Sequence, residues 1–182
     1  MSDMSAQVAL RIERRWAALS IGIIAILTAV AVFAGLHQAV MPQSRVEVVD
    51  PTTLHISGEF TEDNLGTTIE ASGAVIVRAV GQQYSFTPPC MVVPAGMPAT
   101  IRATSSDVVH GFLIQHTNIN TMLVPGYVSV IHIRFEQLGD YAMPCHEFCG
   151  VGHEGMWARV RVIDSAAFRS MVATRPRVSC AE

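Results

Sequence analysis

Hydrophobic and polar residues follow different patterns in the two parts of this chain. The first pattern is a run without any charge, Trp16–Leu36, which is 21 residues long. As a helix such a run is about 30 Å long, the thickness of a membrane's hydrocarbon core. Arg11, Arg14 and Arg15 precede it, so the positive-inside rule places the N-terminus in the cytoplasm. We therefore expect a cytoplasmic lead-in and transmembrane helix in residues 1–40 and an extracytoplasmic domain in residues 41–182.

A cleaved signal peptide is the alternative interpretation of the same segment. The basic start fits, and Ala29-Val-Ala31 has the small residues of a cleavage motif. The hydrophobic core of a signal peptide is usually about 7–15 residues, however, and this run is longer. An uncleaved anchor in the cell membrane is therefore favoured, and both interpretations place the rest of the chain in the same compartment.

Short runs rich in β-branched residues form the second pattern. The clearest is 128–136, where Ile131, Ile133 and Phe135 alternate with His132, Arg134 and Glu136. Further strands are expected at 74–80, 100–104, 108–115, 139–143 and 157–163. Glycine and proline separate these runs, and Asp164 can cap one short helix at 165–173. The pattern predicts a mainly β fold, a Greek-key sandwich or barrel after one N-terminal helix.

Composition changes this picture only slightly. From Arg45 onwards the chain has nine arginines and thirteen acidic residues, a formal charge of −4. An acidic external domain argues against nucleic acid as a partner and permits docking of a basic soluble protein. Cys90 and Cys180 can be paired or free, because connectivity does not follow from sequence. Met91, Met97, Met122 and Met143 are most simply core residues.

The candidate chemistry is concentrated in the loop 145–156, between two expected strands. Its spacing is C-x3-C-x3-H-x2-M, from Cys145, Cys149, His153 and Met156. Soft sulfur ligands together with imidazole select copper, zinc or iron–sulfur, and a thioether favours electron-transfer copper. The alternatives are a disulfide or a structural zinc site, but C-x3-C is looser than the common zinc spacing and leaves Met156 without a role.

His110 is the leading candidate for a further ligand. It lies in Asp107-Val-Val-His110, 35 residues before Cys145. A histidine followed far downstream by a Cys…His…Met loop is the layout of a cupredoxin copper site. A mononuclear blue-copper site needs only one cysteine. With two cysteines, the thiolates can bridge two copper ions, each of which takes one histidine.

With these residues the chain resembles subunit II of haem-copper cytochrome c oxidases, which carries a dinuclear copper A (CuA) centre. The resemblance is to the B-type branch, whose subunit II has a single transmembrane helix. The matching segments are Glu13-Arg-Arg-Trp16, Val49-Asp-Pro-Thr-Thr53, Asp107–Phe112, Thr117-Asn-Ile-Asn120, Pro125-Gly126, Gly139-Asp-Tyr141 and Cys145–Met156. Only the last of these motifs is highly specific.

The resemblance implies a complete ligand set. Cys145 and Cys149 would bridge both coppers, and His110 and His153 would each bind one. Met156 would be the axial ligand of one ion, and the backbone carbonyl of Glu147 would bind the other. In many family members the Glu147 position also helps to hold a magnesium ion at the subunit interface, whereas B-type members can carry Gln there.

Further roles are also implied by the resemblance. Glu13 matches a glutamate at the entrance of a proton channel, although an ordinary ion pair with its arginine neighbours is an equal alternative. Tyr84 and Phe86 fall in a segment that relatives place near the copper, and Trp157 directly follows Met156. These three residues are candidates for an electron path, with plain packing as the alternative.

The implied function is electron entry into a terminal oxidase. The subunit would accept electrons from a soluble cytochrome c or a similar donor and pass them to haem in catalytic subunit I, where oxygen is reduced and protons are translocated. A nitric oxide reductase with the same copper centre is a related alternative. A membrane-anchored copper chaperone is a third, because it also uses C-x3-C with a distant histidine, on a thioredoxin-like domain.

Overall fold

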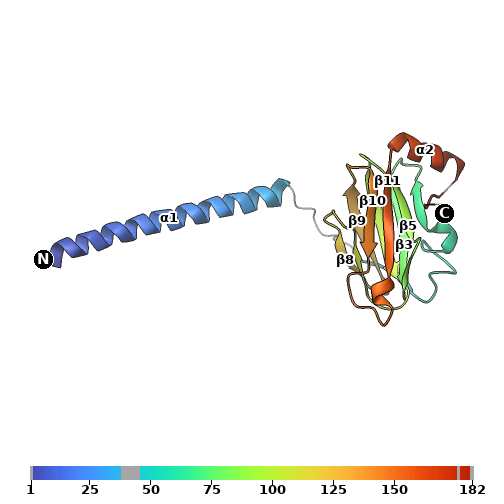
Figure 1. Ribbon diagram of the computed structural model, residues 1–182, viewed down its shortest axis with the longest axis horizontal. Helices are drawn as coiled ribbons and strands as arrows, with labels where there is room; N and C mark the ends of the chain where they lie inside the picture. The colour runs from blue at the N-terminus through green and yellow to red at the C-terminus, as the bar shows by residue number, and fades with distance from the viewer. Residues whose placement is uncertain (1, 38–45, 176, 181–182) are drawn as a thin grey trace. The chain divides into compact units, whose positions relative to one another are not determined.

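The N-terminal part of the protein is one long helix. The computed structural model describes residues 2–37, 46–175 and 177–180, and the chain divides into two compact units, 1–43 and 44–182. The first unit contains α1 (Ser2–His37), in which Ala6–Leu36 is long and apolar enough to cross a membrane (Figure 1). Its leucine, isoleucine and valine side chains are exposed, which is compatible with a helix that crosses a membrane. Residues 38–45, which follow α1, lie outside the described residues.

The second unit is built on a large mixed sheet. Its strands, in spatial order, are β1 (Glu47–Val48), β9 (Tyr127–Arg134), β6 (Pro98–Ser105), β3 (Val75–Gln82) and β2 (Gly66–Ile69), with β4 (Ser85–Thr87) also paired to β3. β3 and β6 run parallel, while the other pairs are antiparallel. The parallel pair requires a crossover between the two layers of the domain, which a simple meander would not provide.

A smaller sheet and a hairpin cover the inner face of the large sheet. The smaller sheet has the order β10 (Gly139–Pro144), β11 (Trp157–Ile163) and β5 (Cys90–Pro94), and β7 (His110–Leu113) pairs with β8 (Asn120–Leu123). The main core lies between these layers, where Val77 and Ile101 of the large sheet meet Met91 and Val160 of the smaller one. The fold is the expected mainly β, cupredoxin-like sandwich.

The C-terminal segment closes the end of the sandwich near β5. Helix α2 (Ser165–Thr174) begins at Asp164, whose side chain accepts hydrogen bonds from two backbone N–H groups of the first turn. Phe168 of α2 is fully buried against a second core cluster that includes Val92. A disulfide between Cys90 and Cys180 then ties the chain end to β5. The structure thus settles the pairing that the sequence left open.

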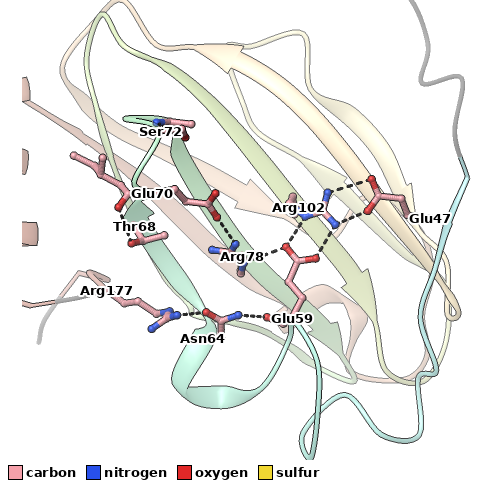
Figure 2. Close-up of polar contacts among 11 residues, drawn as sticks. Glu47, Glu59, Asn64, Thr68, Glu70, Ser72, Arg78, Arg102 and Arg177 are labelled. Atoms are coloured by element: carbon pink, nitrogen blue, oxygen red, sulfur yellow. Dashed lines mark hydrogen bonds and ion pairs between the residues drawn. The ribbon is translucent and has the colours of Figure 1, made fainter.

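The outer face of the large sheet carries an ion-pair network (Figure 2). Glu59 lies between Arg78 of β3 and Arg102 of β6 and pairs with both, at 3.1 and 2.5 Å. Arg102 also pairs with Glu47 of β1 at 2.5 Å, and Arg78 with Glu70 at 2.7 Å. The short helix η1 (Glu62–Asn64) follows Glu59, and the Asn64 side chain donates to the Glu59 carbonyl at 2.6 Å. The network fixes the first part of the domain to the sheet.

All six expected strands were found, but five further strands, β1, β2, β4, β5 and β8, were not predicted. Each of the six predicted runs corresponds to a strand, and α2 matches the predicted helix within one residue. Strand β5 was missed because all five of its residues are buried and no alternation remains to be seen. Met91 and Met143 are core residues as predicted, but Met122 is 53% exposed on β8, so its core assignment was wrong.

Candidate metal centre

The Cys145–Met156 loop connects β10 to β11 at one end of the sandwich. The strands pair up to Pro144 and Trp157, and the next pair is closed by a hydrogen bond from the Cys145 N–H to the Met156 carbonyl at 2.9 Å. Between them the chain turns through the short helix η2 (His153–Gly155). The two ends of the loop are therefore held by the sheet, and its side chains can converge on one point.

Four side chains of this loop do converge. The Cys145 and Cys149 sulfur atoms are 3.8 Å apart, and both residues are buried. The Cys149 sulfur lies 3.6 Å from Nδ1 of His153 and 3.7 Å from Sδ of Met156. Two sulfur ligands of one metal ion are separated by about this distance, because metal–thiolate bonds are about 2.3 Å long.

His110 and the Glu147 carbonyl complete the cluster from the Cys145 side. Nδ1 of His110 lies 3.9 Å from the Cys145 sulfur, and the Cys145 thiol donates to the Glu147 carbonyl at 3.2 Å. The ligand atoms of His110, Cys145 and Cys149 all lie within 4.8 Å of one another. The structure thus brings together the six predicted ligand residues from one loop and the start of β7.

Asp107 determines which nitrogen of His110 faces the sulfur atoms. Its carboxylate accepts a hydrogen bond from Nε2 of His110 at 2.8 Å. Burial opposes ionisation of Asp107, but hydrogen bonds from the Gln83 N–H, the His110 ring and the Val108 N–H outweigh it and lower the pKa of this carboxyl. An ionised carboxylate only accepts hydrogen bonds, so Nε2 of His110 donates to Asp107 and Nδ1 is the nitrogen that faces Cys145.

The two thiols are held in a poorly solvated site. Burial, followed by the hydrogen bond and the charge of Cys145, raises the pKa of the Cys149 thiol to about 11. Without a metal this thiol is therefore protonated at neutral pH, and a metal ion has to displace its proton. Thiolate, imidazole and thioether donors together suit copper, whereas a structural zinc site would have no use for the buried Met156 sulfur.

Comparison with known proteins identifies the family. The family profile "Cytochrome C oxidase subunit II, periplasmic domain" matches residues 75–163. A cytochrome c oxidase subunit 2 of Thermus thermophilus is 30% identical over 152 residues, which cover 82% of this chain and 90% of that protein. The chain belongs to the cytochrome c oxidase subunit II family.

Two further relatives agree with this assignment. Another Thermus thermophilus cytochrome c oxidase subunit 2 is 32% identical over 123 residues, 68% of this chain and 91% of the relative. A chain in the cryo-EM structure of a heme-copper terminal oxidase dimer is 28% identical, with a TM-score of 0.57, over 80% of this chain and 97% of that chain. The similarity extends over most of this subunit II, beyond the metal loop.

The three aromatic candidates lie at different positions around the centre. Phe86 is buried, with its ring edge-on to the His110 ring at a centroid distance of 6.4 Å. Tyr84 is 40% exposed and lies over Gly150 and Gly152 of the metal loop. Trp157 is 55% exposed, and its indole N–H donates to the Glu154 carbonyl at 2.9 Å.

The two remaining candidates are acidic residues with exposed side chains. Glu147 contributes its backbone carbonyl to the cluster, as described above, while its side chain is exposed. Glu13 lies on α1, in the other compact unit, and is also exposed. The structure therefore groups Glu147 with the metal loop and leaves Glu13 as a separate prediction.

Two residues that the sequence analysis did not single out also shape the site. A side chain at Gly111 would place its Cβ 2.4 Å from the Glu147 nitrogen, so only glycine lets β7 approach the loop this closely. Gln83, in the β3–β4 turn, donates from its side-chain amide to the Cys149 carbonyl at 2.5 Å. The position of Gly111 directly after the predicted ligand His110 could have drawn attention to it in the sequence. Gln83 lies in no pattern that would have distinguished it.

Proposed function

We propose that this subunit II is the electron-entry subunit of a terminal haem-copper oxidase, with a dinuclear CuA centre at the Cys145–Met156 loop. The proposal rests on the convergence of the six donor residues, together with the membership of this chain in the subunit II family. His110 and His153 would each hold one copper, Cys145 and Cys149 would bridge both, and Met156 and the Glu147 carbonyl would complete the set. A pair of copper ions held by these residues would supply one-electron redox chemistry.

The protein's own residues favour such transfer by moving little. The cysteines and Met156 are buried, and both ends of their loop are held by β10 and β11. Asp107 holds the His110 ring in one orientation. Ligands fixed in this way rearrange little when the charge changes, and the buried sulfur atoms are shielded from water. The fold also disfavours a copper chaperone, because the domain is a β-sandwich and not a thioredoxin-like domain.

The partners and the setting follow from the same proposal. A soluble cytochrome c or a similar donor would reduce the copper centre, and haem in subunit I would receive the electron. The one membrane-length apolar helix in the described part of the chain and the family's periplasmic domain fit a single-pass membrane protein. The arginines before the uncharged run support an N-terminus in the cytoplasm and a copper domain outside the inner membrane.

The finer assignments are part of this proposal. The presence of one apolar helix of membrane length among the described residues supports the B-type branch. Phe86, whose ring meets the His110 ring edge-on, and Tyr84, which lies over Gly150 and Gly152 of the metal loop, would serve as an electron path, with exposed Trp157 next to Met156 in the chain. The Glu147 carboxylate would face the subunit interface and help to hold a magnesium ion there, and Glu13 would lie at the entrance of a proton channel.

Copper content and the electron paramagnetic resonance (EPR) spectrum test the function directly. The unit 44–182 has its own hydrophobic cores, so we expect it to fold and to take up copper by itself. We expect two coppers per chain and the hyperfine pattern of one unpaired electron shared by two copper nuclei. A single copper per chain, or a tightly bound zinc ion that copper does not replace, would contradict the proposal.

A variant then tests the bridging role. Cys149→Ser should lose the dinuclear spectrum and keep a wild-type far-UV circular dichroism spectrum, because only one buried thiol is changed. Mixing each protein with reduced cytochrome c in a stopped-flow instrument should show rapid oxidation of the cytochrome by the wild-type domain only. An unchanged EPR spectrum in the variant would refute the bridging assignment.

A further inference from the structure

The turn between β3 and β4 lies against both halves of the candidate copper site. The backbone N–H of Gln83 donates to Oδ2 of Asp107 at 2.7 Å, and the other oxygen of Asp107 accepts from His110. The side-chain amide of Gln83 donates to the Cys149 carbonyl at 2.5 Å. One residue thereby connects the His110 side of the site, on β7, to the Cys149 side, in the metal loop.

We propose that Gln83 is a positioning residue of the copper centre, acting through Asp107 and through the Cys149 carbonyl. The inference rests on the proposed function, because it assigns Gln83 a role toward the copper ligands. Its side chain is exposed at the surface of the domain and contributes little to the hydrophobic core. A role in positioning the loop therefore accounts for its contacts better than a role in the stability of the fold.

The Cys149 peptide is a point where the loop needs such support. Cys149 is followed by Gly150, whose φ of +137° lies in a region that other residues rarely adopt. Glycine allows the adjoining peptide to rotate more freely than other residues do. The Cys149 sulfur lies within 3.8 Å of the Cys145, His153 and Met156 donor atoms. Rotation of this peptide would shift a sulfur atom that is placed against three other ligands.

Tyr84 provides a second contact from the same turn. A Cβ built on Gly152 would be 2.7 Å from Cδ2 of the Tyr84 ring, so the ring lies directly on the loop backbone. A Cβ on Gly155, three residues later, would have no neighbour within 4 Å. The turn therefore holds the loop by a hydrogen bond at Cys149 and by ring contact at Gly152.

Two substitutions at Gln83 separate hydrogen bonding from volume. Gln83→Leu removes the amide donor, and Gln83→Glu keeps the shape but presents an acceptor to the Cys149 carbonyl. Both retain the backbone N–H that Asp107 uses. The matched control is Gln82→Leu, at the neighbouring glutamine of β3. The copper-loaded domain is compared by EPR hyperfine pattern, by reduction potential and by the rate of copper release to a chelator.

We expect both Gln83 variants to release copper about fivefold faster, the factor that a net hydrogen bond of about 1 kcal/mol is worth. Their hyperfine pattern and potential should differ from those of the wild type, while the thermal midpoint of the copper-free domain stays unchanged. The Gln82→Leu variant should match the wild type in every readout. Equal spectra, potentials and release rates in all four proteins would overturn the proposal. A lower thermal midpoint in the Gln83 variants, with every copper readout unchanged, would also overturn it.

A copper-free measurement distinguishes failure of this inference from failure of the proposed function. In the copper-free domain, hydrogen exchange at the Gly150–Gly152 amides should be faster in Gln83→Leu than in Gln82→Leu, and equal rates contradict the positioning role. Gly152→Ala should also accelerate exchange, because of the Tyr84 ring, whereas Gly155→Ala should not. If the wild-type domain bound one copper or none, the proposed function would fail while the exchange comparison would still decide whether the turn positions the loop.

Discussion

Two polar clusters in this domain differ in whether their side chains pair with one another. On the outer face of the large sheet, two arginines and three glutamates contact one another at 2.5 to 3.1 Å, with each arginine paired to two carboxylates. At the end of the sandwich, two thiols, two imidazoles and a thioether lie 3.6 to 3.9 Å apart. The first cluster is closed by its own ion pairs, while the second has donor atoms at metal–ligand spacing.

The two clusters also differ in charge, because the ion-pair network is charged and the Cys149 thiol is neutral. Hydrogen bonds from Arg102 to Glu59 and Glu47 raise the pKa of this guanidinium, so the network stays charged. Burial instead raises the pKa of the Cys149 thiol, so the metal loop is uncharged there until a metal arrives. A cluster that satisfies itself contributes to the fold, whereas a buried cluster of convergent, neutral donors is suited to a ligand.

Gly111→Ala should give the largest change in the metal centre. A Cβ at this position would lie 2.4 Å from the Glu147 nitrogen and 2.6 Å from two backbone atoms of His146, so the loop has to move. We expect loss of the dinuclear EPR signal and fewer than two coppers per chain. Gly155→Ala, with open space around the new methyl group, serves as the control and should bind copper normally. A wild-type spectrum for Gly111→Ala would show that the close approach of β7 is unnecessary.

Asp107→Asn should weaken the centre without abolishing it. An amide no longer enforces the Nε2–H tautomer of His110, and loss of such an outer hydrogen bond typically costs about 10–100-fold in metal affinity. Competition with a chelator of known affinity measures this change. An affinity equal to that of the wild type would mean that the loop alone orients the His110 ring.

Copper binding should become weaker as the pH falls. Because the pKa of the Cys149 thiol is about 11 without metal, its proton is bound throughout the range from pH 6 to 9. Copper displaces that proton, so the apparent affinity should fall about tenfold for each unit of decreasing pH, for each proton displaced. Chelator competition at several pH values gives the slope. An affinity independent of pH over this range would contradict a protonated resting thiol.

Glu59→Gln should affect stability and leave the copper centre unchanged. The substitution removes the charge that Arg78 and Arg102 share, and both arginines are mostly buried. We expect a loss of about 1–3 kcal/mol in the free energy of unfolding, measured by urea denaturation. The exposed Asp140–Arg161 pair is the comparison, and Asp140→Asn should shift the urea midpoint far less. A changed EPR spectrum in Glu59→Gln would show that the two clusters are coupled.

Local sequence patterns were sufficient for the elements whose two faces meet different surroundings. Alternation predicted β9 and β11, and Asp164 predicted the start of α2. The same rule explains the failure at β5, which has core on one face and α2 with the C-terminal segment on the other. Parallel pairing of β3 with β6, and of β5 with β11, joins distant segments and has no local signal.

The sequence by itself determined the donor set, because Cys145, Cys149, His153 and Met156 lie within one loop and their side-chain chemistry favours copper. Only the tertiary structure decided how that set is held. The approach of His110, the contact at Gly111 and the bonds from Gln83 all join residues that are far apart in the chain. Ligand identity is a property of single residues, whereas ligand orientation depends on which strand ends the sandwich brings to the same edge.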